Sequence, residues 1–243
     1  MKTIYLAGLF IAMAFSSAVR AQTSLEIEGA YVVPGYNDVS VPGDTGSRFS
    51  LSDDLQADDT TAWRLRLGYT FAEKHWVALM AAPLTTESSG TLNEGVDFNG
   101  TTFSAGTAVD STFRFDSYRL IYRYQFHQSD RWQIQGGGAL KVRDAAIRLE
   151  GGGLRAEKKN TGAVPLLSFN VTWTPSERVH VLMDGEALAA PQGRAEDILF
   201  AARYNVNPTL ALQAGYRILE GGADNDEVYT FSLFHQATVG VLL

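Results

Sequence analysis

The sequence has no cysteine, few prolines and a small share of charged residues. Because Cys is 0, disulfide scaffolds, thiolate metal sites and cysteine nucleophiles are excluded. The chain has Pro 7 and Gly 23, and 45% of its residues are hydrophobic and 11% aromatic. This composition is too apolar for a disordered chain and too rich in glycine for a helical bundle. We therefore expect the 243 residues to fold and to be rich in β-strands.

A long hydrophobic run is missing outside the first 21 residues. There Lys2 precedes an apolar stretch, and Val19-Arg20-Ala21 supplies a small-residue cleavage site, so residues 1–21 are predicted to be a signal peptide.

The remaining residues, 22–243, are expected to form one domain. They carry 18 basic and 27 acidic residues, a net charge of -9, which disfavours nucleic acid as a partner. No later run approaches the ~20 apolar residues of a spanning helix, so an exported chain must enter a membrane as strands.

Apolar residues recur at every second position in segments of roughly ten residues. In the clearest segment, Trp63, Leu65 and Leu67 share one parity, and Arg64 and Arg66 occupy the other. This period of two is that of a strand with one apolar and one polar face. The predicted strands are Leu25–Val33, Trp63–Phe71, Trp76–Pro83, Tyr118–Phe126, Trp132–Val142, Val164–Trp173, Val179–Glu186, Asp197–Val206, Leu210–Ile218 and Val228–Leu243.

Short and long connections alternate between these segments. Tight turns are predicted at 72–74, 127–130, 175–178 and 207–208. Hydrated, mobile loops are predicted at the other end, long ones near 35–60, 85–112 and 150–162 and shorter ones near 188–196 and 220–227. Outer-membrane barrels have short periplasmic turns and longer external loops. The sequence therefore predicts an all-β fold, a transmembrane up-and-down antiparallel β-barrel in the bacterial outer membrane. The expected number of strands is about ten, within a range of eight to twelve.

Large aromatic residues gather at both ends of the predicted strands. A soluble barrel gives no reason for two such rows, whereas amphipathic rings prefer the headgroup depth of a membrane. We therefore expect the apolar parity to face lipid and the strands to close, because unpaired backbone groups are costly there. The predicted aromatic girdle comprises Tyr69, Phe71, Trp76, Phe126, Trp132, Trp173 and Tyr204 at the turn end and Tyr31, Trp63, Tyr118, Tyr216 and Tyr229 at the loop end.

The opposite parity collects charges of both signs. One interpretation is an ion-pair network that fills a narrow lumen, because unpaired buried charges are unfavourable. The other is a thin hydrated path for small anionic solutes. Ten strands lie close to the filled limit, which excludes a wide porin. The predicted lumen charges are Arg64, Arg66, Arg119, Arg123, Lys141, Arg143, Arg203, Arg217, Glu26, Glu28, Asp184, Glu186 and Asp197.

Histidines offer two enzymatic alternatives. His127-Gln128-Ser129 resembles the His-x-Ser pair of lipid A deacylases, but it falls in a predicted periplasmic turn. His180 shares a face with Asp184 and Glu186, which resembles the base and orienting carboxylates of outer-membrane proteases, although a lumen ion pair is the simpler interpretation. No catalytic residue is therefore assigned.

Metal and cofactor sites have weak support in the sequence. His75 and His235 lack partners at ligand spacing, so no transition-metal site and no cofactor are predicted. One predicted external loop carries four carboxylates, which suit either a solvated hairpin tip or a loose divalent-cation site. These residues are Glu220, Asp224, Asp226 and Glu227.

The last predicted strand ends in an alternating row from Phe231 to Leu243. It resembles the C-terminal signal read by the bacterial barrel-assembly machinery, except that Leu243 replaces an aromatic residue and His235 interrupts the row. In organisation the chain resembles the small outer-membrane protein W class across residues 22–243. The segments 141–145, 164–167, 190–194 and 215–222 also resemble a group of exported barrels to which no activity is attached.

These resemblances imply a fold and a location, and they transfer no catalytic residue. The leading hypothesis is a non-enzymatic outer-membrane barrel, either structural or a narrow channel for small solutes, possible anions among them. The alternatives are a barrel whose loops bind a partner and a lipid-modifying or proteolytic enzyme. Expected partners are outer-membrane lipid and lipopolysaccharide, the assembly machinery and periplasmic chaperones.

Overall fold

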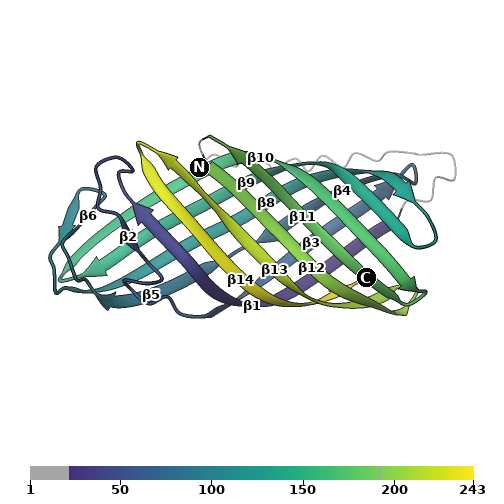
Figure 1. Ribbon diagram of the computed structural model, residues 1–243, viewed down its shortest axis with the longest axis horizontal. Coiled ribbons are helices and arrows are strands. Elements are labelled where there is room, and N and C mark those ends of the chain that lie inside the picture. The colour runs from purple at the N-terminus through teal and green to yellow at the C-terminus, as the bar shows by residue number, and fades with distance from the viewer. Residues whose placement is uncertain (1–21, 192) are drawn as a thin grey trace, which may run out of the picture.

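The computed structural model describes residues 22–191 and 193–243, so the expected signal peptide lies outside the described residues. Within them, ten strands form a closed antiparallel barrel, as predicted (Figure 1). Each strand pairs with the next along the chain, and β14 closes the barrel on β1. The wall consists of β1 (Gln22–Ser40), β3 (Thr60–Phe71), β4 (His75–Ala82) continued by β5 (Thr85–Thr91), β8 (Ala108–Gln128), β9 (Trp132–Gly151), β10 (Leu154–Ser176), β11 (Val179–Ala190), β12 (Gly193–Asn207), β13 (Leu210–Asn225) and β14 (Val228–Leu242).

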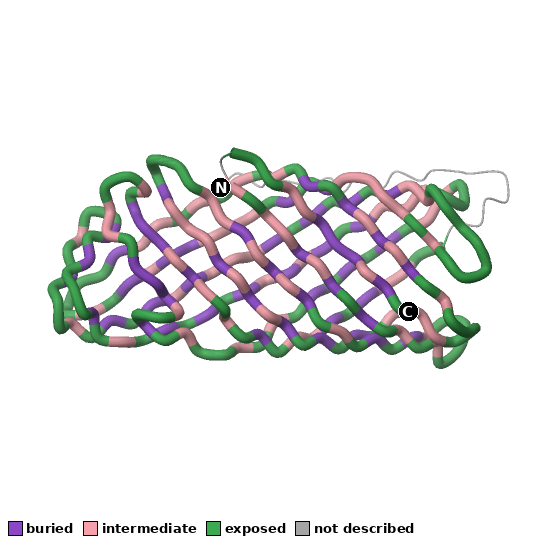
Figure 2. The backbone as a smooth tube through the Cα atoms, in the orientation of Figure 1, coloured by how far each residue is buried: buried purple, intermediate pink, exposed green. Residues whose placement is uncertain are grey.

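Burial alternates along the strands, as Figure 2 shows in the purple and green bands of the wall. On β3, Leu65 and Leu67 are 40% and 54% exposed on the outside, whereas Arg64 and Arg66 are each 6% exposed on the inside. Successive side chains of a strand point to opposite faces, so the period of two in the sequence becomes an apolar exterior and a polar interior. The described part of the chain has no helix long and apolar enough to cross a membrane.

Four tight turns lie at one end of the barrel, at 72–74, 129–131, 177–178 and 208–209. Both ends of the described chain lie there too, because Leu25 and Leu243 exchange two backbone hydrogen bonds of 2.9 Å. This is the turn end that the sequence predicts for an up-and-down barrel, and its strand order is confirmed.

At the opposite end the strands run further than predicted. β9 and β10 pair as far as Gly151 and Leu154, and β13 and β14 pair as far as Asn225 and Val228. The predicted long loop near 150–162 and the shorter ones near 188–196 and 220–227 are therefore wrong, since strands and tight turns occupy the described residues of these ranges. Beyond the apolar band the apolar parity switches: on β9, Leu140 and Val142 face outward, whereas Ile147 and Leu149 are buried on the inside, so the regular pattern breaks while the backbone ladder continues.

The two remaining connections, 41–59 and 92–107, fold into the mouth of the barrel. They include the short strands β2 (Phe49–Ser50), β6 (Val96–Phe98) and β7 (Thr101–Phe103). Their apolar side chains pack against the inner wall, and Leu55, Phe98 and Phe103 are 0% exposed. The prediction of hydrated loops is wrong here. We call this cluster the apolar cap; its loop residues are Val41, Phe49, Leu51, Leu55, Leu92, Val96, Phe98 and Phe103.

Candidate functional site

The barrel interior holds a network of five arginines and five carboxylates contributed by six strands. Glu26 and Glu28 come from β1, and Asp184 and Glu186 come from β11, each pair two residues apart and so on one face of its strand. Every one of these side chains is at least nine-tenths buried. The remaining members are Asp197 on β12 and the arginines Arg64, Arg66, Arg119, Arg123 and Arg217.

Asp197 lies at the centre of one half of this network. It accepts hydrogen bonds from Arg64 at 2.9 Å, from Arg217 at 2.6 Å and from Arg119. Arg217 also reaches both oxygens of Glu28, at 3.0 and 3.1 Å. Fork-shaped guanidinium groups suit such multiple contacts, and the pairing offsets the desolvation of the charges.

Asp184 and Glu186 form the other half. Arg123 bridges them, Arg66 contacts Asp184 at 3.0 Å, and Arg119 joins Glu186 to the Asp197 cluster. Arg64 also lies 3.6 Å from Glu28, and Arg66 lies 3.6 Å from Glu26. Each arginine therefore contacts two carboxylates, and the five positive charges match the five negative ones. The network connects distant strands across the lumen, and each of its carboxylates contacts at least one arginine.

Neutral side chains on β10 complete the network. Ser168 accepts a 2.7 Å hydrogen bond from Arg123 Nε and donates to Glu186, and Asn170 donates to Asp184 at 3.0 Å. The sequence analysis missed both residues because it collected charges alone. Their parity, opposite to the outward Leu167 and Trp173, is the signal that could have found them.

Three of the predicted lumen cations lie outside the network. Arg203 donates to Gln213 Oε1 at 2.9 Å, and Arg143 contacts Asn160. Lys141 is 3% exposed and lies 4.5 Å from the centre of the Phe115 ring. In the described residues it has no ion pair and no hydrogen bond, so it is a positive charge in excess of the balanced set.

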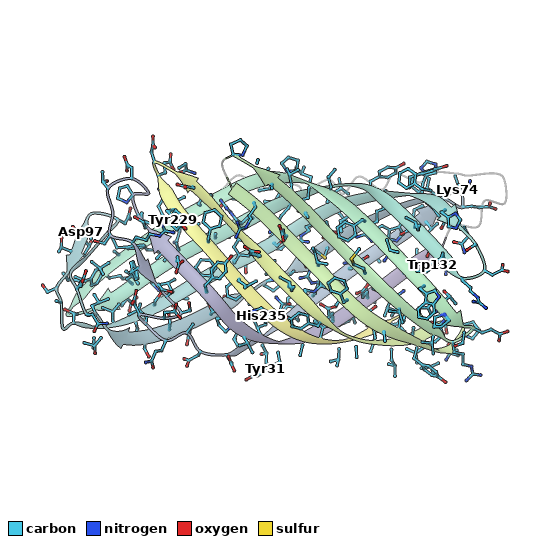
Figure 3. All side chains as sticks on the ribbon, in the orientation of Figure 1. Tyr31, Lys74, Asp97, Trp132, Tyr229 and His235 are labelled. Atoms are coloured by element: carbon cyan, nitrogen blue, oxygen red, sulfur yellow. The ribbon has the colours of Figure 1, made fainter. Side chains whose placement is uncertain are left out.

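Most of the predicted girdle residues point outward. Figure 3 shows Trp132 near the turn end, Tyr31 further along the wall and Tyr229 near the opposite end. Exposed aromatic rings are Tyr31, Trp63, Tyr118 and Tyr216 on the loop side and Tyr69, Phe126, Trp132, Trp173 and Tyr204 on the turn side, with Phe71 half-buried. Tyr229 lies beyond this loop-side row: Tyr31 pairs with Ala237 of β14, whereas Tyr229 pairs with Ser40 at the far end of β1. The Arg48 guanidinium lies 3.7 Å from the centre of the Tyr229 ring.

Trp76 corrects the predicted girdle, because its ring faces the lumen. The Arg123 guanidinium lies 5.0 Å from the ring centre, and a side chain at Gly68 would meet the Trp76 ring at 2.7 Å. On β4 the outward parity is that of His75 and Leu79, the latter 60% exposed. Glycine at position 68 leaves room for the inward indole.

The histidines lie apart from the carboxylates of the network. His180 bonds to Thr174 Oγ1 at 3.0 Å and to Asn205 Nδ2 at 2.8 Å, and His127 is exposed at the turn end. Asp184 and Glu186, which share the strand with His180, bind arginines instead. The structure therefore does not assemble the base and carboxylates that the enzymatic alternative on His180 requires.

The four carboxylates of the candidate cation loop do not converge. Glu220 accepts hydrogen bonds from Tyr36 and Arg194 on the outside of the wall, and Glu227 lies 3.6 Å from Lys158. Asp224 and Asp226 belong to the hairpin tip. Residues 22–191 and 193–243 contain no cluster of three or more side chains suited to a metal ion.

The sequence matches no known protein family and no curated protein. Among solved structures, the chain is similar to the outer membrane protease OmpT from Escherichia coli, with a TM-score of 0.56 and 7% identity over 96% of this chain and 98% of that one. It is more distantly similar to Ail, the attachment invasion locus protein of Yersinia pestis, with a TM-score of 0.40 and 11% identity over 90% and 99% of the two chains.

A third structure, the toluene transporter TodX of P. putida, has a TM-score of 0.33 and 11% identity over 90% of this chain and 89% of that one. At these identities the likeness concerns the fold alone. The chain has the fold of Gram-negative outer-membrane β-barrels, a group whose members differ in activity.

Proposed function

We propose that this protein spans the bacterial outer membrane as a closed, non-conducting and non-enzymatic barrel with a structural role. The exterior supports the location, because a continuous apolar surface such as that of Leu67, Leu79 and Leu120 is unfavourable in water and favourable against lipid. Expected contacts are outer-membrane lipid, lipopolysaccharide, the assembly machinery and periplasmic chaperones.

The observation that carries the proposal is the double closure of the lumen. The ion network crosses the interior with side chains such as Arg123, Glu186 and Arg217 that are at most 2% exposed. Above it, the apolar cap packs into the mouth from residues 41–59 and 92–107. A hydrated ion would have to break several charge-assisted hydrogen bonds and pass an apolar cluster, which opposes conduction.

Planar-bilayer recording tests this proposal. Purified residues 22–243, shown to be folded and inserted by heat-modifiable gel mobility, should give no discrete conductance steps. A matched sample of Lys159→Met, a change on the outside of the wall, should be equally silent. Reproducible steps from the wild-type protein would contradict a closed lumen.

A narrow anion path is the second candidate, because Lys141, Arg143 and Arg203 add positive charge beyond the balanced network. If steps occur, this candidate expects anion selectivity that falls in Arg203→Gln. Loop-mediated binding has less support, since Phe98 and Phe103 of the connection 92–107 are buried in the apolar cap.

A further inference from the structure

The barrel wall is interrupted between β10 and β11. These strands pair from Ser176–Val179 only as far as Leu167–Ala187. Beyond that point β10 continues along β9 to Leu154, and β11 continues along β12 to Ala190. Residues 164–166 of β10 and 188–190 of β11 therefore face each other without a shared ladder. In Figure 1 the strands β11 and β12 stop well short of the end that β9 and β10 reach.

Proline marks the same stretch. Pro165 lies on the part of β10 that β11 no longer accompanies, and a residue without an N–H is tolerated in a strand where a ladder bond is absent. Two features therefore accompany the interruption: Pro165 in the sequence, and the unequal lengths of β10 and β11, which have 23 and 12 residues.

A cavity of about 420 Å³ lies behind this interruption. Val164 and Pro165 line it from β10, Leu188 from β11 and Ala195 from β12, and Lys141 and Arg143 contribute positive charge from β9. A site of this volume with apolar walls and a few convergent polar groups has the character of a small-ligand pocket.

The Lys141 ammonium is the unusual group in this cavity. It is 3% exposed and lies 4.5 Å from the centre of the Phe115 ring, and among the described residues it has no hydrogen bond and no ion pair. Arg143 contacts Asn160, and its buried Nε has no partner in the described chain. A buried cation without a counter-ion is costly, and the nearby carboxylates are committed to arginines, so an anion from outside would stabilise this pair.

The outer wall places the interruption at the border of the apolar band. Below it, Leu167 and Phe200 are exposed apolar side chains. Above it, Arg194 forms an ion pair with Glu220 on the outside of the wall, beside Tyr36. This change from apolar to charged side chains is what an outer-leaflet headgroup region requires.

We propose that the opening between β10 and β11 admits the phosphate group of an outer-leaflet lipid to Lys141 and Arg143, while its acyl chain stays outside against Leu167. The inference goes beyond the proposed structural role and rests only on its membrane location. It stands whether or not the lumen conducts.

Binding of dodecyl phosphate to the full chain, residues 22–243, in neutral maltoside micelles tests the site. We expect saturable binding by calorimetry, weakened at least tenfold in Lys141→Met. The control Lys159→Met removes the same charge from the outer face of β10 and should bind as the wild type does, since Lys159 is 65% exposed. Heat-modifiable gel mobility verifies that each variant is folded, and Lys141→Gln replaces Lys141→Met if the latter fails to fold.

Each other outcome overturns the proposal. Absence of saturable binding to the wild type removes the site, and equal binding by Lys141→Met or Lys141→Gln removes the role of Lys141. If inorganic phosphate binds as tightly as dodecyl phosphate, the site takes a free anion and the lipid source is wrong. Conductance is measured separately, so a failure here is distinguishable from a failure of the closed-barrel proposal.

Discussion

The two halves of the barrel interior are closed by different interactions. Near the turn end, arginines and carboxylates such as Arg123 and Asp184 fill the lumen with directional contacts. Near the loop end, Phe49, Phe98 and Phe103 fill it by apolar packing. The difference predicts that loss of one charge disrupts several strands at once, whereas loss of one apolar ring loosens the cap and leaves the wall intact.

The largest effect should come from Asp197→Asn. This nearly isosteric change leaves Arg64, Arg119 and Arg217 without a shared counter-charge in a buried site. Removing one partner from a buried ion pair costs about 3–5 kcal/mol, so the free energy of unfolding by urea in lipid vesicles should fall by that order. Asp58→Asn, at an exposed loop position, serves as the control and should change it little.

Phe98→Ala tests the other half. Phe98 is 0% exposed and contacts Phe49 edge-on, with 6.3 Å between the ring centres. Truncating a buried phenylalanine costs on the order of 3 kcal/mol. We expect this loss to appear as faster proteolysis within 92–107, with the unfolding transition of the wall nearly unchanged. A fall in wall stability as large as that of Asp197→Asn would erase the distinction between the halves.

Trp76 provides a sharper test of which side chains belong inside. In variants that retain a single tryptophan, brominated lipids should quench Trp132 and Trp173, which are 45% and 40% exposed. They should leave Trp76 largely unquenched, because its ring lies under Arg123 in the lumen. Equal quenching of Trp76 would return it to the girdle and contradict the orientation of β4.

The smallest effect should come from the ion pair between Glu220 and Arg194 on the outside of the wall. Partial burial raises the pKa of Glu220, but hydrogen bonds from Tyr36 and Arg194 outweigh it and hold that pKa below its ordinary value. The stabilisation is therefore complete at neutral pH and is lost as the pH falls through the lowered pKa. Because Arg194 is half-exposed, Glu220→Gln should cost under about 1 kcal/mol at pH 7 and nothing once the carboxyl is protonated.

A pH series of melting temperatures for the wild type and Glu220→Gln tests this prediction. The two curves should converge in acid. A constant offset down to the most acidic pH would show that Glu220 acts through packing and not through its charge.

The fold was predictable because the alternation of Leu65 with Arg64 and Arg66 is local and repeats along the chain. Trp76 was misplaced since β4 carries apolar side chains on both parities: Met80 faces inward and Leu79 outward. The choice between them depends on Gly68, which belongs to another strand. Alternation by itself does not reveal such a contact.

The apolar cap and the wall opening were missed for the same reason. Residues such as Leu55 and Phe98 stand singly among polar neighbours and become buried only when distant segments meet. The opening reflects the unequal reach of β10 and β11, of which Pro165 is the one local trace. The lumen charges could be placed inside by parity, but their partners required the strand register.

The most direct test of the central assignment of faces uses spin labels, and the absence of cysteine makes single labels at Leu67→Cys and Leu120→Cys straightforward. The native side chains are 54% and 55% exposed on the outer wall. In bilayers both labels should be accessible to oxygen and shielded from a water-soluble nickel complex. Labels shielded from both reagents would place these positions in a protein interior and contradict the account.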